Sequence, residues 1–203
     1  MQSTKSRIFA HRGIWGASRQ NSLSAISQAI DLGFAVETDL RLLKDQVVLS
    51  HDPVQLELAD ELNSILPSKA PLALNIKMDG LIPFLNADAL NVSDYFFFDG
   101  SMPELYKYRQ LGLKTACRVS ELETEMPWNT EVVWLDSFSH EWWIEGEVLQ
   151  RLTSNAMVVV VSPELHGRDR LQTWELVRQE FMDGNPNIAI CTDHPEEFQS
   201  VLI

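Results

Sequence analysis

The sequence predicts an α/β protein built as a (β/α)8 TIM barrel. Short apolar runs recur along the whole chain with helix-like segments between them, and polar side chains cluster where these runs end. The 203 residues are 45% hydrophobic and 22% charged, which is the make-up of a globular protein with a sizeable core. We therefore expect a single domain that spans residues 1–203.

Eight short runs, most of them rich in Val, Ile, Leu or Phe, are typical of parallel strands covered on both faces. They comprise residues 7–11, 35–40, 72–77, 95–99, 115–119, 132–136, 157–161 and 188–192. A further run, 47–51, follows Lys44-Asp45-Gln46 too closely for a crossover helix, so we interpret it as a hairpin extension of the second strand. Eight strands fit a closed barrel better than an open sheet.

Helical patterns lie between the predicted strands. Asn21-Ser22 is a predicted N-cap for a helix that begins at Leu23, and Gly33 is its predicted C-terminal stop. Apolar residues at three- and four-residue spacing predict helices over residues 103–111, 142–152 and 171–181. In the link 120–131 we expect no more than a turn of helix.

Charge and composition restrict the partners. The formal net charge of −13 disfavours nucleic acid and an anionic membrane surface. No run approaches the length that spans a bilayer and the N-terminal residues include no apolar leader, so we expect a cytoplasmic protein without stable membrane insertion. Cys117 and Cys191 lie in apolar strand-like runs, as reduced core thiols do. A small anionic substrate requires a cation, or local Arg and Lys residues, inside a cleft.

Polar residues at the ends of the first two strands are the main candidates for chemistry. His11 supplies a proton carrier near neutral pH, and Arg12 beside it is a fixed cation that can bind phosphate. Glu37 and Asp39 are two residues apart on a strand, so both carboxylates point to the same face. Two such anions repel each other unless a hard divalent ion such as Mg²⁺ or Ca²⁺ joins them. Solvent-facing carboxylates are disfavoured, because a central barrel strand has no solvated face.

The hairpin brings His51 to the same rim. Two histidines allow one base and one acid, which together can cleave a phosphodiester. On the third strand, Asn75 and Lys77 point into the barrel, where substrate phosphate or the neighbouring acidic pair would give Lys77 a partner.

Further around the rim, the sequence leaves two readings open for Arg118 at the end of the fifth strand. Its side chain either binds substrate phosphate or forms an ion pair inside the barrel with Asp99 or Asp136. The remaining histidines lack an acidic pair nearby, and we expect them to be structural, with His166 the nearest to an exception. They are His140, His166 and His194.

An ordered set of motifs resembles the glycerophosphodiester phosphodiesterase family, whose barrels are related to the phosphatidylinositol-specific phospholipases. The set is His11-Arg12-Gly13, Asn21, Glu37-x-Asp39, Lys44-Asp45, His51-Asp52-Pro53, Lys77 and Thr192-Asp193-His194-Pro195. The resemblance implies a catalytic pair at His11 and His51, a phosphate-binding Arg12, and Glu37 and Asp39 as ligands of Mg²⁺ or Ca²⁺. It also implies attack on phosphorus by a neighbouring substrate hydroxyl or by water.

The third strand departs from the family pattern. Asn75 stands where the family has a glutamate as third metal ligand, two residues before the lysine that Lys77 matches. An asparagine oxygen still binds a hard cation, but more weakly because it lacks the full charge. We expect Asn75 to take this place, with Glu164 or Asp99 as residues that could compensate.

The resemblance predicts a metal-dependent hydrolase of a small, glycerophosphodiester-like substrate. The departure at Asn75 supports a second hypothesis, a degenerate barrel that binds a phosphorylated sugar or lipid headgroup without turning it over. In a third, Lys77 or Arg118 replaces the cation.

Overall fold

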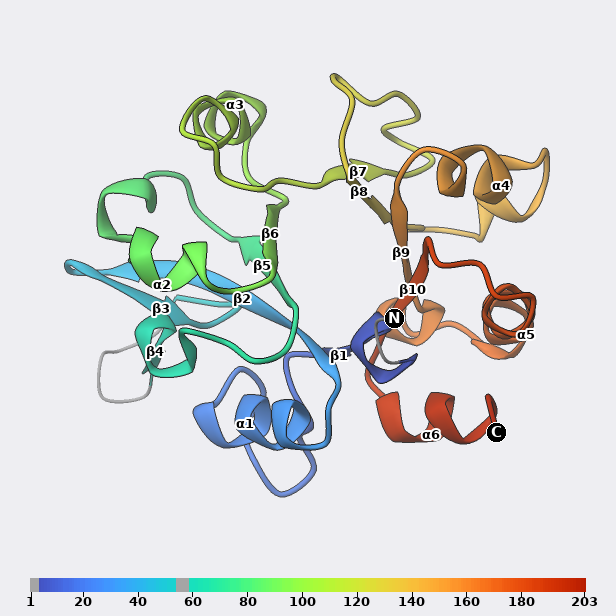
Figure 1. Cartoon of the computed structure of the whole chain (residues 1–203), viewed down its shortest axis with the longest axis horizontal. Helices are drawn as coiled ribbons and strands as arrows, with labels where there is room; N and C mark the ends of the chain where they lie inside the picture. Colours follow the sequence, from blue (N-terminus) through green and yellow to red (C-terminus); the bar gives the residue numbers. More distant parts are fainter. Residues whose placement is uncertain (1–3, 54–58) are drawn as a thin grey trace.

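The computed structural model describes residues 4–53 and 59–203, and its central feature is a ring of eight parallel strands with helices outside (Figure 1). The strands are β1 (Ile8–His11), β2 (Ala35–Leu43), β5 (Leu72–Ile76), β6 (Tyr95–Phe98), β7 (Cys117–Val119), β8 (Val132–Leu135), β9 (Met157–Val161) and β10 (Ile188–Thr192). Neighbouring strands pair in parallel from β6 through β5, β2, β1, β10, β9 and β8 to β7. These are the eight predicted strands.

The ring closes between β6 and β7 through a single bridge, here called the β6–β7 seam. Phe97 pairs in parallel with Thr115. The backbone N–H of Phe97 donates to the carbonyl of Lys114 at 2.9 Å, and the N–H of Ala116 donates to the carbonyl of Phe97 at 2.8 Å. The β2–β5 pair, in contrast, has five residue pairs in register. The predicted barrel is confirmed, with this seam as its sparsest joint.

A hairpin extends the second strand, as predicted. After a turn at Lys44, whose φ is 56°, β3 (Gln46–Leu49) runs antiparallel to β2. The short strand β4 (Asp60–Glu61) pairs with β3. The backbone N–H of Ser50 donates to the carbonyl of Asp39 at 2.9 Å, so the end of the hairpin is fixed to the barrel rim.

Helices cover the outside of the ring. The α-helices are α1 (Leu23–Asp31), α2 (Ala87–Asn91), α3 (Met102–Gln110), α4 (Val148–Thr153), α5 (Leu171–Met182) and α6 (Pro195–Ser200). The 3₁₀ turns are η1 (Thr4–Arg7), η3 (Leu62–Ile65), η4 (Ile82–Phe84), η5 (Trp142–Ile144) and η6 (Pro163–His166). Ser22 caps α1 as predicted, because its side chain accepts a hydrogen bond from the N–H of Ala25.

One predicted helical segment differs from the structure. The helix expected over residues 142–152 is divided into η5 and α4, because Gly146 and Glu147 both have positive φ, 74° and 58°. Right-handed helices exclude that backbone conformation. The link 120–131, all of it described, forms turns and no helix, in agreement with the expectation of at most one helical turn.

The alternation along each strand divides the core into two layers. An inner cluster fills the barrel, and Phe98 and Trp134 within it have ring centroids 4.1 Å apart. An outer cluster lies between ring and helices and includes Leu72, Leu74 and Ile76. The packed interior leaves the C-terminal ends of the strands as the place where polar side chains gather.

Both cysteines are buried and free. Burial raises the pKa of the Cys117 thiol and raises that of Cys191 well above its usual value. Among the residues that the structure describes, no helix has the length and apolar character needed to cross a membrane.

Candidate active site

His11 is the last residue of β1, and its ring lies between two carboxylates. Its Nδ1 lies 2.7 Å from Oδ1 of Asp193, which follows the neighbouring strand β10. Its Nε2 lies 3.8 Å from Oε2 of Glu37 on β2. A carboxylate that accepts a hydrogen bond from Nδ1 fixes the ring and leaves Nε2 for proton transfer. The motif at residues 192–195 marks this strand end, but the sequence does not pair Asp193 with a residue 182 positions away.

A tight turn after His11 directs Arg12 onto β2. Arg12 has a φ of 59° and Gly13 a φ of 84°. A Cβ atom on Gly13 would lie 2.5 Å from the backbone carbonyl carbon of Ala25, so only glycine fits. The turn lets the Arg12 N–H donate to the Glu37 carbonyl at 2.9 Å and brings Arg12 Nε to 2.9 Å from Oδ2 of Asp39.

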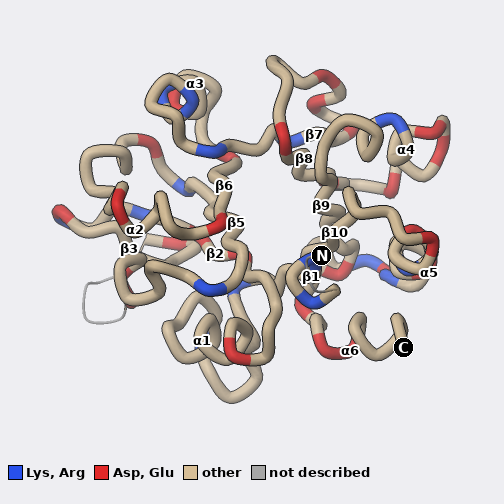
Figure 2. The backbone as a smooth tube through the Cα atoms, in the orientation of Figure 1, with Lys and Arg blue, Asp and Glu red and all other residues tan. Residues whose placement is uncertain are grey.

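Glu37 and Asp39 both point into the barrel, as predicted, and are 1% and 0% exposed. Asn21 Nδ2 donates to Oδ2 of Asp39 at 2.8 Å, and Lys77 Nζ lies 3.3 Å from Oδ1 of Asp39. Burial, followed by the charge of Asp39, raises the pKa of Glu37 to about 7, although nearby His11, Arg12 and Lys77 act to lower it. The acidic pair therefore lies among cations. Figure 2 marks the positions of Lys, Arg, Asp and Glu along the backbone.

Asn75 lies beside the acidic pair, in register with Asp39 on the neighbouring strand. Its buried Oδ1 has no hydrogen-bond partner among the described residues. Glu164, in contrast, accepts hydrogen bonds from the hydroxyls of Ser162 and Thr192. Asp99 accepts one from Arg118 at 3.1 Å. Of the three residues considered as third ligand, Asn75 is the one with an unpartnered buried oxygen.

This donor set fits an oxygen-preferring divalent cation only when Asn75 is included. Within residues 4–53 and 59–203, no three His, Cys, Asp or Glu side chains gather as a metal site. The carboxylates of Glu37 and Asp39 and the free amide oxygen of Asn75 have the chemistry that Mg²⁺ and Ca²⁺ prefer. Arg12 and Lys77 already neutralise part of the charge of Asp39, so the attraction for a cation is reduced.

His51 lies at the end of the hairpin with 44% of its side chain exposed. Its Nδ1 lies 3.0 Å from Oδ1 of Asp52, and its carbonyl accepts a hydrogen bond from Arg41 Nε at 2.7 Å. The backbone is thus fixed while the ring remains accessible to solvent.

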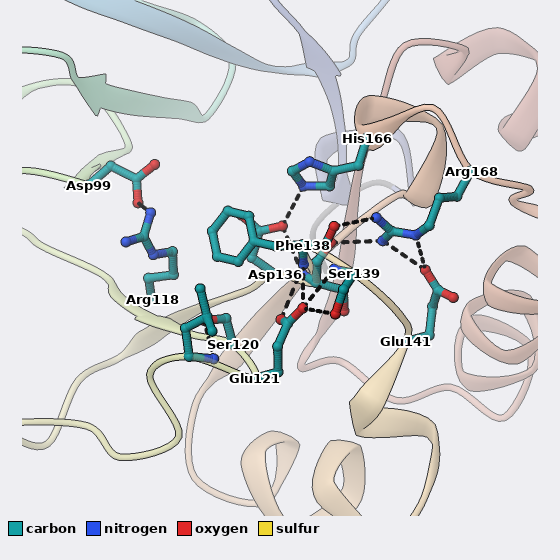
Figure 3. A network of polar contacts seen from close by, with 12 residues as sticks. Asp99, Arg118, Ser120, Glu121, Asp136, Phe138, Ser139, Glu141, His166 and Arg168 are labelled. Atoms are coloured by element: carbon teal, nitrogen blue, oxygen red, sulfur yellow. Dashed lines mark hydrogen bonds and ion pairs between the residues drawn. The ribbon is translucent and has the colours of Figure 1, made fainter.

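Further around the same rim, the ends of β6 to β9 carry a second polar cluster (Figure 3). Arg118 pairs with Asp99, one of the two predicted partners, and its Nε also lies 2.6 Å from Oε2 of Glu123. His166 Nε2 lies 2.8 Å from Oδ1 of Asp136. Sequence reasoning gave His166 no role, because nothing in the sequence indicates that η6 returns its ring to the end of β8.

Glu121 and Arg168 fix the backbone of Phe138 within this cluster. The N–H of Phe138 donates to Glu121 Oε1 at 2.9 Å, and Arg168 Nη1 donates to the Phe138 carbonyl at 3.0 Å. Slight burial acts to raise the pKa of Glu121, but hydrogen bonds from Ser139 and the Phe138 N–H lower it to about 2. Phe138 is 39% exposed.

Part of the chain matches a known protein family. Residues 11–94 match the model of the glycerophosphoryl diester phosphodiesterase family. The matched segment runs from His11 into the loop before β6, so it includes the acidic pair, His51, Asn75 and Lys77. No curated protein matches the sequence.

Solved structures share the fold at low sequence identity. A glycerophosphodiester phosphodiesterase from Agrobacterium tumefaciens has a TM-score of 0.66 at 13% identity, covering 95% of this chain and 98% of its own. A putative glycerophosphoryl diester phosphodiesterase from Silicibacter pomeroyi has 0.61 at 13%, covering 97% and 92%. A phosphodiesterase from Oleispira antarctica, solved with the product sn-glycerol-3-phosphate, has 0.60 at 15%, covering 97% and 96%.

The match at residues 11–94 contains most of the residues gathered at the rim of β1, β2 and β5. The barrel that presents them is the fold of solved phosphodiesterases. Residues 11–94 therefore resemble the glycerophosphoryl diester phosphodiesterase family, and the whole chain shares the barrel fold of solved phosphodiesterases.

Proposed function

We propose that this protein hydrolyses a small phosphodiester of the glycerophosphodiester type, using His11 and His51 for proton transfer. The observation that carries the proposal is the orientation of His11. Asp193 holds its Nδ1, and its Nε2 points toward Glu37. A base poised beside paired carboxylates and fixed cations is the arrangement that phosphodiester cleavage needs. The product found with the Oleispira antarctica phosphodiesterase, sn-glycerol-3-phosphate, is consistent with this class of substrate.

Arg12 and Lys77 are the proposed phosphate ligands. Both lie within ion-pair distance of Asp39, at 2.9 and 3.3 Å, so they converge on one point of the rim. Donors fixed at that point can stabilise the charge that develops on the phosphoryl oxygens. Arg118 was also expected to bind phosphate, and this role stays a prediction. Its guanidinium is shared by Asp99 and Glu123, so less positive charge is available there.

The two histidines divide the proton transfers. One removes the proton from the attacking hydroxyl or water, and the other protonates the leaving alkoxide. The Asp193 hydrogen bond supports a fixed orientation for His11. The exposure of His51 supports contact with the more accessible part of a bound substrate.

We further propose that Glu37, Asp39 and Asn75 hold a divalent cation, Mg²⁺ or Ca²⁺, which when bound supplies charge stabilisation at the phosphoryl group. Asn75→Asp tests the ligand set, because a third carboxylate should tighten Mg²⁺ binding about tenfold. Calorimetric titration measures this affinity independently of activity. Asn91→Asp, at the end of α2, is the matched control. An unchanged affinity in Asn75→Asp would exclude Asn75 as a ligand.

A second function, binding of a phosphorylated sugar or lipid headgroup without turnover, is favoured by one observation. Asp39 is engaged by Arg12, Lys77 and Asn21, and the residue opposite it is an amide rather than an acid. Assays of glycerophosphodiesters and bis(p-nitrophenyl) phosphate with Mg²⁺, Ca²⁺ and Mn²⁺ separate the two functions. We expect hydrolysis that His11→Ala abolishes. Binding of phosphate esters without any turnover would instead support the second function. Full activity in EDTA would show that the reaction needs no divalent cation.

A further inference from the structure

We propose that the rim formed by Asp99, Arg118, Asp136, Phe138 and His166, here called the β6–β9 wall, binds the alcohol part of the substrate. We further propose that this alcohol is an uncharged polyol, such as a sugar or a cyclitol. Arg118 lies within β7 and the other four follow the ends of β6, β8 and β9, on the same rim as His11 and Glu37 (Figure 3). The proposed chemistry leaves most of them unused. The inference rests on the proposed phosphodiesterase function.

Phe138 is the centre of the wall. Exposing an aromatic ring to water costs free energy. Phe138 is nevertheless held in its exposed position, because Glu121 and Arg168 fix its backbone from both sides. His166 contacts the ring edge-on, with centroids 5.6 Å apart and an interplanar angle of 64°. A rigid, partly exposed ring suits the stacking of an apolar face, such as the C–H face of a sugar.

Hydrogen-bonding groups flank the ring as matched pairs. His166 and Asp136 form one pair, at 2.8 Å, and Arg118 and Asp99 form the other, at 3.1 Å. Each pair presents a donor beside an acceptor. Hydroxyl groups both donate and accept hydrogen bonds, so a polyol can use both members of a pair.

The charges of the wall disfavour other alcohols. A quaternary ammonium group at these rings would meet a like charge, because the guanidinium of Arg118 lies 5.5 Å from the centroid of Phe138 and that of Arg109 lies 4.9 Å from the centroid of Trp128. An anionic alcohol would meet the carboxylates of Asp99, Glu123 and Asp136. An uncharged alcohol avoids both costs.

A cavity adjoins the Asp99–Arg118 end of the wall. This cavity, of about 800 Å³, lies between α3 and the link 120–131, and Asp99 and Arg118 contribute to its lining. Met102, Met126 and Trp128 also line it. The link forms no helix among its described residues, so this side of the barrel has space that a crossover helix would fill.

The test compares two diesters that share glycerol phosphate and differ in the alcohol, glycerophosphoinositol and glycerophosphocholine. We expect the full-length protein to have a kcat/KM at least about tenfold higher for the inositol diester, since stacking and hydroxyl contacts act on that alcohol alone. Phe138→Ala should reduce this ratio about fivefold or more, mainly through KM. Leu171→Ala removes a side chain that is 70% exposed on α5, and as the matched control it should keep the wild-type ratio.

Equal kcat/KM for the two diesters, preference for the choline diester, or a ratio unchanged in Phe138→Ala would overturn the inference. Failure of the proposed function has a different signature. In that case, no diester, including bis(p-nitrophenyl) phosphate, is turned over, or its hydrolysis persists in His11→Ala.

Discussion

Asp193 determines how His11 meets a substrate. Its carboxylate accepts a hydrogen bond from Nδ1, so the proton-transfer atom is Nε2. Asp193→Asn offers an amide N–H that favours the opposite tautomer, and we expect kcat to fall about 100-fold while the fold is retained. Steady-state kinetics measures the loss.

Asp31→Asn is the matched control for this substitution, because Asp31 is exposed at the end of α1. It should leave kcat unchanged. A wild-type kcat in Asp193→Asn would show that the tautomer of His11 does not limit the reaction.

Gly13 is a second residue whose substitution should have a large effect, in this case on stability. Gly13→Ala places a Cβ atom 2.5 Å from the backbone of Ala25 at a φ of 84°, so we expect the free energy of unfolding to fall by about 2 kcal/mol or more. Urea denaturation measures the change. Gly16→Ala is the control, since a Cβ atom there meets nothing within 4 Å. Equal stabilities of the two variants would contradict the steric argument.

Among the elements, the β6–β7 seam is where the barrel should open first. The seam rests on one bridge, whereas β2 and β5 share five registered pairs. Local opening exposes the least stabilised hydrogen bonds first. We therefore expect the amides of Phe97 and Ala116 to exchange with deuterium faster than those of Leu74 and Ile76. Hydrogen exchange followed by NMR checks the order, and protection at the seam equal to that of β5 would refute it.

The sequence predicts the strands better than it predicts what joins them. All eight were correctly located because a strand covered on both faces reads as an apolar run, whatever lies beside it. The helix expected over 142–152 is interrupted because Gly146 and Glu147 take positive φ, and apolar spacing carries no information about that backbone choice. Helix ends with local caps, such as Ser22, were predicted correctly.

In the candidate site, too, local patterns were predicted from the sequence and long-range contacts were not. His11, Glu37 and Asp39 were identified from short-range patterns, and the structure brings them together. The contacts of Asp193 with His11 and of His166 with Asp136 join distant strand ends. Such pairs depend on how the ring closes, which no local pattern records.

At the level of the whole molecule, both thiols should report on unfolding. The thiolate is the reactive form, and burial raises the pKa of Cys117 and Cys191, so at pH 8 the folded protein holds fewer thiolates than the unfolded chain. We expect no rapid reaction with a thiol-specific disulfide reagent in buffer and reaction of both cysteines in urea. Absorbance of the released thiolate measures this. Rapid labelling of the folded protein would show that a cysteine is accessible.

The order of strands around the ring separates two tasks. Most residues proposed for chemistry lie on or just after β1, β2 and β5, while the β6–β9 wall lies on or just after the strands on either side of the seam. If the wall binds the alcohol as proposed, changes in it alter which alcohol is accepted without disturbing the acidic pair. Natural selection, or an engineer, can vary one half of such a barrel while the other half is kept.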